Sequence, residues 1–290
     1  MMTVAVVADL HTHSNASDGV LAPAELVQKA AGAGLRALAL TDHDTLNGIP
    51  EALTAGAQSG LQIIPGIELS CGWADREPSL HMLGLFIDHR ATGLNELLDQ
   101  QRRGRKTRAL QILDKLEGLG VPVQPLRESF LREQAQALGR PHIARYLVDI
   151  KAIQDFQEGF RRYLGRGCPA YVPKPHVLPE DGIRLVHQAG GIACIAHPGL
   201  VPDWDAIWPR IAGLPWDGIE AVYAEHTPSQ VERFTALARS QNWLITGGSD
   251  YHGEAGKHVA RLGEQGLTDE QFQQLAEAAR QRLSRRGELT

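Results

Sequence analysis

Cysteine is scarce in this sequence, and long apolar runs are missing. Three cysteines, Cys71, Cys168 and Cys194, are scattered without paired spacing, which argues against a disulfide framework and suits a reducing compartment. No stretch approaches the roughly 20 apolar residues of a membrane span. The apolar segment 4–8 is only five residues long and lacks a basic flank, so it does not fit a signal peptide. We therefore expect a soluble, cytoplasmic protein that does not bind membranes.

The chain also lacks an excess of positive charge. Its 29 lysines and arginines are outnumbered by 34 aspartates and glutamates, for a formal net charge of −5. A global basic face for duplex nucleic acid is therefore not expected. The strongest basic run, residues 102–108, fits a solvated helix face, with a basic stripe for short single-stranded RNA as the alternative. No feature of the sequence indicates an obligate protein partner.

Short apolar runs alternate with helical patterns over most of the chain. Its 290 residues suffice for a barrel-sized domain or for a domain with an insertion. Helices separate most of the expected strands, and this alternation predicts an α/β protein with a mainly parallel sheet or barrel. Strands are expected near residues 4–9, 35–40, 61–67, 80–87, 191–197, 218–222 and 244–247, and helices from residue 23 and near 48–58, 180–189 and 269–284.

The middle of the chain has a different character. Long helical patterns dominate residues 94–178, at 94–118, 128–137, 141–149 and 153–164, with no clear buried strand. We interpret this segment as a helical insertion into a barrel formed by residues 1–93 and 179–290.

Histidines and carboxylates recur where the expected strands end. His11 and His13 follow the first strand, and residues two apart in an extended segment point to the same side. Side chains for chemistry collect at the C-terminal edge of the strands in α/β folds. The full set of such residues is His11, His13, Asp18, His43, Glu68, His81, His197, Asp250 and His252.

This set predicts a metal centre with more than one ion, because nine ligands are too many for a single cation. Mixed nitrogen and oxygen donors suit Mn²⁺, Fe²⁺ or Zn²⁺ and argue against Mg²⁺ or Ca²⁺ alone. Clustered divalent ions make hydroxide available near neutral pH and stabilise an in-line displacement at phosphorus. The residues therefore favour a hydrolase of phosphate esters.

In order and spacing, these motifs resemble those of the PHP (polymerase and histidinol phosphatase) family. The resemblance rests on the segments around His11-Thr12-His13, Thr41-Asp42-His43-Asp44, Gly66-Ile67-Glu68, His81, Ala196-His197-Pro198 and Ser249-Asp250-Tyr251-His252. It implies a distorted (β/α)7 barrel with three divalent ions at its C-terminal mouth, Mn²⁺ first, with Fe²⁺ or Zn²⁺ as alternatives. The implied ligands are His11, His13, Glu68 and Asp250 for the first ion, Glu68, His81 and His197 for the second, and Asp18, His43 and His252 for the third. The residues given a catalytic role are His11, His13, Glu68, His197 and Asp250.

The helical insertion resembles that of the bacterial members that act on nucleotides. The segments 139–145, 163–167 and 170–172 carry this likeness. It implies that the insertion lies over the active site, where Arg140 and His142 hold substrate phosphate. A guanidinium suits bidentate phosphate binding, with a solvated basic residue before a helix as the alternative interpretation of Arg140. His226 fits either a substrate or leaving-group contact or a polar residue at a helix start.

Four functions follow from these observations. The leading hypothesis is a metal-dependent phosphatase that removes the 3′-phosphate of nucleoside 3′,5′-bisphosphates and leaves nucleoside 5′-monophosphate. A 5′-to-3′ exoribonuclease on short RNA is the second. Histidinol phosphate phosphatase shares the metal site, but the insertion favours nucleotides. A non-catalytic metal-bound regulatory module is the fourth, and the complete ligand set counts against it.

Overall fold

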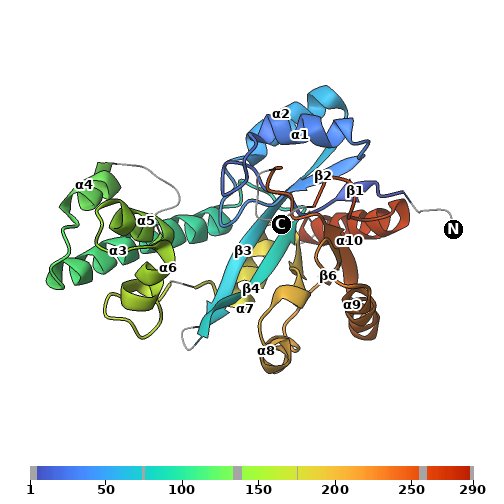
Figure 1. Ribbon diagram of the computed structural model, residues 1–290. Helices are drawn as coiled ribbons and strands as arrows, with labels where there is room; N and C mark the ends of the chain where they lie inside the picture. The colour runs from blue at the N-terminus through green and yellow to red at the C-terminus, as the bar shows by residue number, and fades with distance from the viewer. Residues whose placement is uncertain (1–4, 74–75, 133–138, 175, 255–259, 288–290) are drawn as a thin grey trace. The chain divides into compact units, whose positions relative to one another are not determined.

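The computed structural model describes residues 5–73, 76–132, 139–174, 176–254 and 260–287. The chain forms two compact units (Figure 1), one of Met1–Glu96 with Val177–Thr290 and one of Leu97–His176. Within the described ranges, no helix has both the length and the apolar character that a membrane crossing needs.

The first unit is built on a seven-stranded sheet in which the strands follow one another in sequence order. Its ends approach each other, because the Leu10 amide, just after the first strand, donates to the Gly247 carbonyl of the last at 3.1 Å. The sheet is therefore a nearly closed barrel, which confirms the expected α/β barrel. The strands are β1 (Ala8–Asp9), β2 (Ala37–Leu40), β3 (Gln62–Trp73), β4 (Arg76–Leu85), β5 (Ile192–Ile195), β6 (Gly218–Tyr223) and β7 (Leu244–Gly248).

Strand β4 departs from the parallel arrangement. It runs antiparallel to both β3 and β5, whereas the other neighbouring pairs are parallel. Trp73 pairs with Arg76, so no helical crossover separates β3 from β4, and strands joined so directly must run antiparallel. Both strands are also longer than the apolar runs 61–67 and 80–87 indicated. The reversal places His81 within its strand rather than after its end.

Helices accompany the strands of this unit. Helix α1 starts with proline at its first position, which suits the fixed φ of that residue, and it buries Leu26, Val27 and Ala30. Helix α8 was not expected from the sequence. Helix α9 follows the helix start that was one interpretation of His226, and Thr227 and Gln230 form a capping box there. The helices are α1 (Pro23–Gly32), α2 (Ile49–Ser59), α7 (Pro179–Gln188), α8 (Trp204–Ile211), α9 (Pro228–Gln241) and α10 (Asp269–Gly287), with a 3₁₀ turn at Pro198–Leu200.

The second unit is helical in the part that the structure describes. It contains most of α3 (Thr92–Gly118), then α4 (Gln124–Arg132), α5 (Arg140–Asp149), α6 (Phe156–Gly159) and a π-helical turn, Phe160–Leu164. Apolar side chains from these helices, including Leu113, Leu116, Ile143 and Leu147, form its own core. The helix expected at 128–137 ends, as far as it is described, at Arg132, and residues 133–138 lie outside the described residues.

Candidate metal centre

His11 and His13 enter the barrel mouth from the extended segment after β1. Two hydrogen bonds hold Thr12, the residue between them. The Thr12 amide donates to Thr41 Oγ1 at 3.1 Å, and Thr12 Oγ1 donates to the Ala39 carbonyl at 2.6 Å. Alternation then turns both flanking imidazoles to the same side. They are 0% and 1% exposed.

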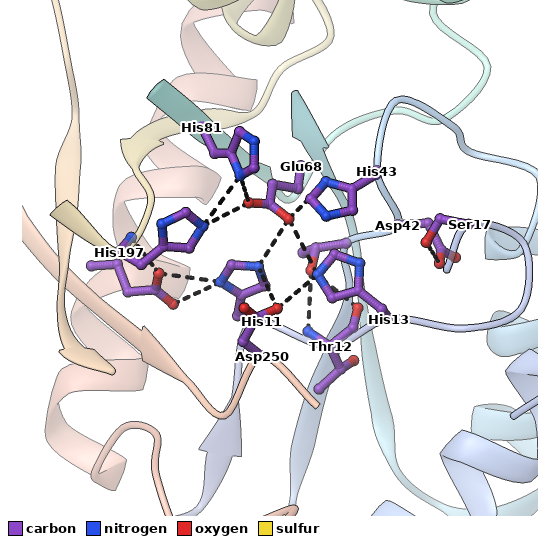
Figure 2. A network of polar contacts seen from close by, with 12 residues as sticks. His11, Thr12, His13, Ser17, Asp42, His43, Glu68, His81, His197 and Asp250 are labelled. Carbon is purple, nitrogen blue, oxygen red and sulfur yellow. Dashed lines mark hydrogen bonds and ion pairs between the residues drawn. The ribbon is translucent and has the colours of Figure 1, made fainter. Parts of the chain in front are cut away.

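Glu68 of β3 lies at the centre of the cluster (Figure 2). Its Oε2 atom is 3.2 Å from Nε2 of both His11 and His13, and 3.0 Å from Nδ1 of His43. Its Oε1 atom is 2.6 Å from Nδ1 of His81 and 2.9 Å from Nε2 of His197. One buried carboxylate thus contacts five imidazoles, which come from four separate segments of the chain.

Asp250 and His252, after β7, complete one side of the cluster. The Oδ1 atom of Asp250 lies 3.0 Å from His13 Nε2 and 3.3 Å from His11 Nε2. His252 Nε2 lies 3.2 Å from Oδ1 of Asp18. Asp250 has a φ of 54°, a left-handed conformation that non-glycine residues rarely adopt and that is concentrated at functional sites.

All nine residues therefore meet at one barrel mouth. Among the residues that the structure describes, donor atoms within 4.8 Å of one another form three groups. His197 adjoins the group around His81, since His81 Nδ1 and His197 Nε2 are 3.3 Å apart. The groups are His11, His13, Glu68 and Asp250, then His43, Glu68 and His81, and then His13, Asp18, His43 and His252.

The donor atoms fit a bound cation. His11 Nε2, His13 Nε2, His43 Nδ1 and Glu68 Oε2 are buried and make no hydrogen bond, although the three nitrogens lie within 3.2 Å of Glu68 Oε2. A buried polar atom without a partner is destabilising by about 1–3 kcal/mol, and a divalent cation would satisfy several of these atoms at once. Imidazole nitrogens mixed with carboxylate oxygens are the donors that Mn²⁺, Fe²⁺ and Zn²⁺ accept.

Opposite charges within the cluster shift the pKa values of its members. Burial lowers the pKa of His13, but the adjacent carboxylates of Asp250 and Glu68 outweigh burial and raise it to about 9. Burial raises the pKa of Glu68, but nearby imidazoles, His43 and His81 foremost, hold it well below its ordinary value. By contrast, burial lowers the pKa of His43 to about 4. The carboxylates are thus ready to bind a cation, while protons compete for part of the imidazoles.

Metal affinity is expected to rise with pH up to about 9, because His13 must lose its proton before it binds a cation. Below that pKa, each rise of one pH unit lowers the apparent dissociation constant for the metal about tenfold for each proton released. The same proton stabilises the metal-free fold. That stabilisation is complete below the ordinary pKa of 6.5 and is lost as the pH rises through about 9. Calorimetric titration with Mn²⁺ in buffers of different ionisation enthalpy measures both affinity and proton release. An affinity that does not change between pH 6.5 and 9 would contradict this expectation.

Residues around the cluster hold its loops in place. Asp42 accepts hydrogen bonds from the Ser14 amide at 2.8 Å, from Ser14 Oγ at 2.7 Å and from Ser17 Oγ at 2.6 Å, which fixes the loop that carries Asp18. Asp9 is fully buried and accepts from the Ser249 amide at 3.0 Å. Burial raises its pKa to about 6. Sequence reasoning gave neither aspartate a role, although both belong to the histidine motifs.

The three residues expected to contact substrate lie in different settings. Arg140 packs its guanidinium 5.6 Å from the Phe160 ring centre, and its NH1 group donates to the Leu164 carbonyl at 3.3 Å. His142 is exposed in the first turn of α5. His226 is buried, with Nδ1 hydrogen-bonded to the Ala221 carbonyl at 3.0 Å and Nε2 accepting from the Gly199 amide at 3.0 Å. Burial lowers the pKa of His226.

A nearly closed α/β barrel with six imidazoles and three carboxylates gathered at one mouth defines a class, the metal-dependent hydrolases of phosphate esters. The comparisons with known proteins agree. A family model described as the PHP domain matches residues 9–119. The chain is 38% identical to a 5′-3′ exoribonuclease from Haemophilus influenzae over 84% of this chain and 89% of that one.

Two further likenesses extend over nearly the whole chain. A 3′,5′-nucleoside bisphosphate phosphatase from Chromobacterium violaceum is 35% identical over 87% of this chain and 90% of its own. A solved structure from Bifidobacterium adolescentis, described as a metal-dependent phosphoesterase, superposes with a TM-score of 0.71 at 29% identity, covering 93% of this chain and 95% of that one. The chain belongs to the PHP family and is a metal-dependent phosphoesterase.

Proposed function

We propose that this protein removes the 3′-phosphate of nucleoside 3′,5′-bisphosphates and releases nucleoside 5′-monophosphate and inorganic phosphate. The observation that carries the proposal is the buried Glu68 carboxylate in contact with five imidazoles. The name of the Chromobacterium violaceum relative supports this substrate class.

The proposed centre holds three divalent ions, with Mn²⁺ first and Fe²⁺ or Zn²⁺ as alternatives. When bound, such ions lower the pKa of coordinated water and neutralise charge on phosphoryl oxygens. The chain's own part is to hold the donors in place: His11, His13, Glu68 and Asp250 in one set, Glu68, His81 and His197 in a second, and Asp18, His43 and His252 in a third. Because Glu68 belongs to the first two sets, a displacement of its carboxylate would disturb both.

The second phosphate of the substrate is assigned to Arg140 and His142 of the helical insertion. A guanidinium offers paired N–H donors to phosphate oxygens, and the stacking of Arg140 on Phe160 limits where these donors can point. His226 is assigned to the leaving group. Its Nδ1 faces the Ala221 carbonyl and its Nε2 accepts from the Gly199 amide, so Nε2 would have to gain a proton before it could donate one to the leaving oxygen.

Phosphate release from adenosine 3′,5′-bisphosphate tests the proposal directly. With Mn²⁺ added, the protein is expected to release one phosphate and to leave adenosine 5′-monophosphate, which it hydrolyses no further. Adenosine 5′-monophosphate alone serves as the matched substrate control, and chromatography identifies the product. Absence of phosphate release from the bisphosphate by fully metal-loaded protein would sink the proposal.

Arg140→Ala is expected to raise KM for the bisphosphate about tenfold or more, the loss expected for charge-assisted hydrogen bonds to phosphate. Arg145→Ala, an exposed arginine on the same helix, is the control and should leave KM unchanged. Circular dichroism checks that the variant keeps its fold, because Arg140 also packs on Phe160. An unchanged KM in folded Arg140→Ala would remove Arg140 from the substrate site.

A 5′-to-3′ exoribonuclease on short RNA is the second candidate, and the name of the Haemophilus influenzae relative supports it. The basic run of α3, residues 102–108, gives weaker support than this name does, because two of its arginines already make contacts within the protein. Arg102 is paired with Asp99, and buried Arg108 donates from Nε to the Val172 carbonyl at 2.8 Å. A 5′-phosphorylated oligoribonucleotide decides between the candidates: stepwise mononucleotide release supports the exoribonuclease, and intact RNA excludes it.

A further inference from the structure

Strand β6 differs from the other strands of the barrel, because it supplies none of the nine predicted ligands. Each of the others contains such a residue or ends shortly before one: β1 precedes His11 and His13, β2 precedes His43, β3 contains Glu68, β4 contains His81, β5 precedes His197, and β7 precedes Asp250 and His252. Nevertheless, β6 carries two buried polar side chains. Glu220 is 0% exposed and Tyr223 is 1% exposed.

An irregularity in β6 turns both side chains toward the metal centre. Against β7, Glu220 pairs with Thr246 and Val222 pairs with Gly247, so Ala221 is an additional residue on the β6 side. Positions three apart in a regular strand face opposite sides, but one bulged residue restores the same side. As a result, Glu220 and Tyr223 both reach residues of the cluster.

Glu220 contacts two of the predicted ligands. Its two carboxylate oxygens lie 3.0 and 3.2 Å from Nδ1 of His11, and Oε2 also accepts from the His197 amide at 2.7 Å. An ionised carboxylate only accepts hydrogen bonds, so it selects the form of His11 with a proton on Nδ1. The Nε2 atom of His11 then directs its lone pair toward Glu68 and Asp250.

Tyr223 contacts a further predicted ligand, Asp250. Its hydroxyl donates to Oδ2 of Asp250 at 2.9 Å. The other oxygen of the same carboxylate, Oδ1, is the one within 3.0 Å of His13 Nε2. The phenol therefore holds the Asp250 carboxylate in the rotation that presents Oδ1 to the cluster.

We propose that β6 is a positioning strand of the metal centre: Glu220 sets the tautomer of His11 and the place of His197, and Tyr223 sets the rotation of Asp250. The proposal rests on the metal centre of the proposed function but not on its substrate. Metal binding and histidine tautomers, rather than turnover, therefore test it. Failure to hydrolyse bisphosphates would leave it standing.

Glu220→Gln is the sharpest variant, because an amide keeps the size of the side chain but only one of its two ends accepts hydrogen bonds. If the amide oxygen keeps the His197 amide, its NH₂ group faces His11 Nδ1 and favours the tautomer with a proton on Nε2. Zn²⁺ affinity, measured by competition with a chelating dye, is expected to fall about ten- to a hundredfold. Tyr223→Phe removes only the hydroxyl and is expected to weaken Zn²⁺ binding about tenfold.

Thr246→Val is the matched control. Thr246 is the β7 partner of Glu220, is 0% exposed, and its hydroxyl makes no hydrogen bond, so this variant should bind Zn²⁺ as the unmodified protein does. If Glu220→Gln and Tyr223→Phe fold and bind Zn²⁺ with unchanged affinity, the proposal is wrong.

A measurement on the unmodified protein keeps the test decisive if Glu220→Gln does not fold. Nitrogen-15 correlation spectra of the histidine rings in the Zn²⁺-loaded protein report which ring nitrogen carries the proton. The resonance of His11, identified by its loss in His11→Gln, is expected to show a proton on Nδ1. A proton on Nε2, or Nδ1 bound to the metal, would overturn the assignment of Glu220.

Discussion

Glu68→Gln is expected to lower kcat/KM for phosphate release by about a thousandfold or more in the presence of Mn²⁺. Glutamine keeps the volume of the side chain but loses its charge, and its NH₂ group would face ring nitrogens instead of presenting an oxygen. The carboxylate that it replaces lies within 3.2 Å of nitrogens on His11, His13 and His43 through Oε2. Elemental analysis of the purified variant should show fewer bound ions per chain.

Glu232→Gln provides the comparison for this result. Glu232 is an exposed glutamate on α9, so the same chemical change there should leave activity and metal content as they are. Activity of Glu68→Gln within about tenfold of the unmodified protein would mean that the carboxylate does not organise the centre, since one lost electrostatic contact at a reacting group typically exceeds that effect.

Gly248→Ala is expected to destabilise the fold by about 3 kcal/mol or more, a value at the upper end of overpacking effects. A Cβ atom there would lie 2.5 Å from both the backbone nitrogen and Cβ of His11, and 2.9 Å from Oδ1 of Asp9. These atoms belong to the buried junction between β1 and β7, where neither strand can retreat without displacing a predicted ligand. Chemical denaturation of the metal-free protein measures the loss.

Gly32→Ala tests whether the effect is specific to this junction. Gly32 is the last residue of α1, and a Cβ atom there would meet nothing within 4 Å. Alanine is favoured over glycine in helices by up to about 1 kcal/mol, so this variant should be as stable as the unmodified protein or slightly more stable. If Gly248→Ala unfolds at the same denaturant concentration as Gly32→Ala, the contact at β1 and β7 is not as tight as the structure shows.

The barrel and the residues at its mouth were largely predictable because their signals are local. The alternation that turns His11 and His13 to one side depends only on an extended backbone. The α/β order of strands and helices depends on apolar periodicity, which the sequence displays directly. Thr268, just before the last helix, accepts from the Gln271 amide at 3.3 Å, and this cap also spans only a few residues.

Other features depended on contacts between distant segments. The direction of β4 follows from its direct connection to β3, which the short apolar runs near 61–67 and 80–87 did not reveal. Glu220 is one charged residue in an apolar run, and its contact with His11 exists only where β6 and the segment after β1 meet in the barrel. The substrate roles of Arg140, His142 and His226, and the limits 94–178 of the insertion, remain predictions.

By itself, the sequence determined the chemistry of this protein, because imidazole and carboxylate donors are properties of residue types and their order is visible without a fold. Only the tertiary structure decided which donors share a point in space. It brought Glu68 between five imidazoles, and it supplied Glu220 and Tyr223 from a strand that carries no predicted ligand. The physical reason is distance along the chain: His11 and Glu220 are 209 residues apart, and no local pattern records a contact that barrel closure alone creates.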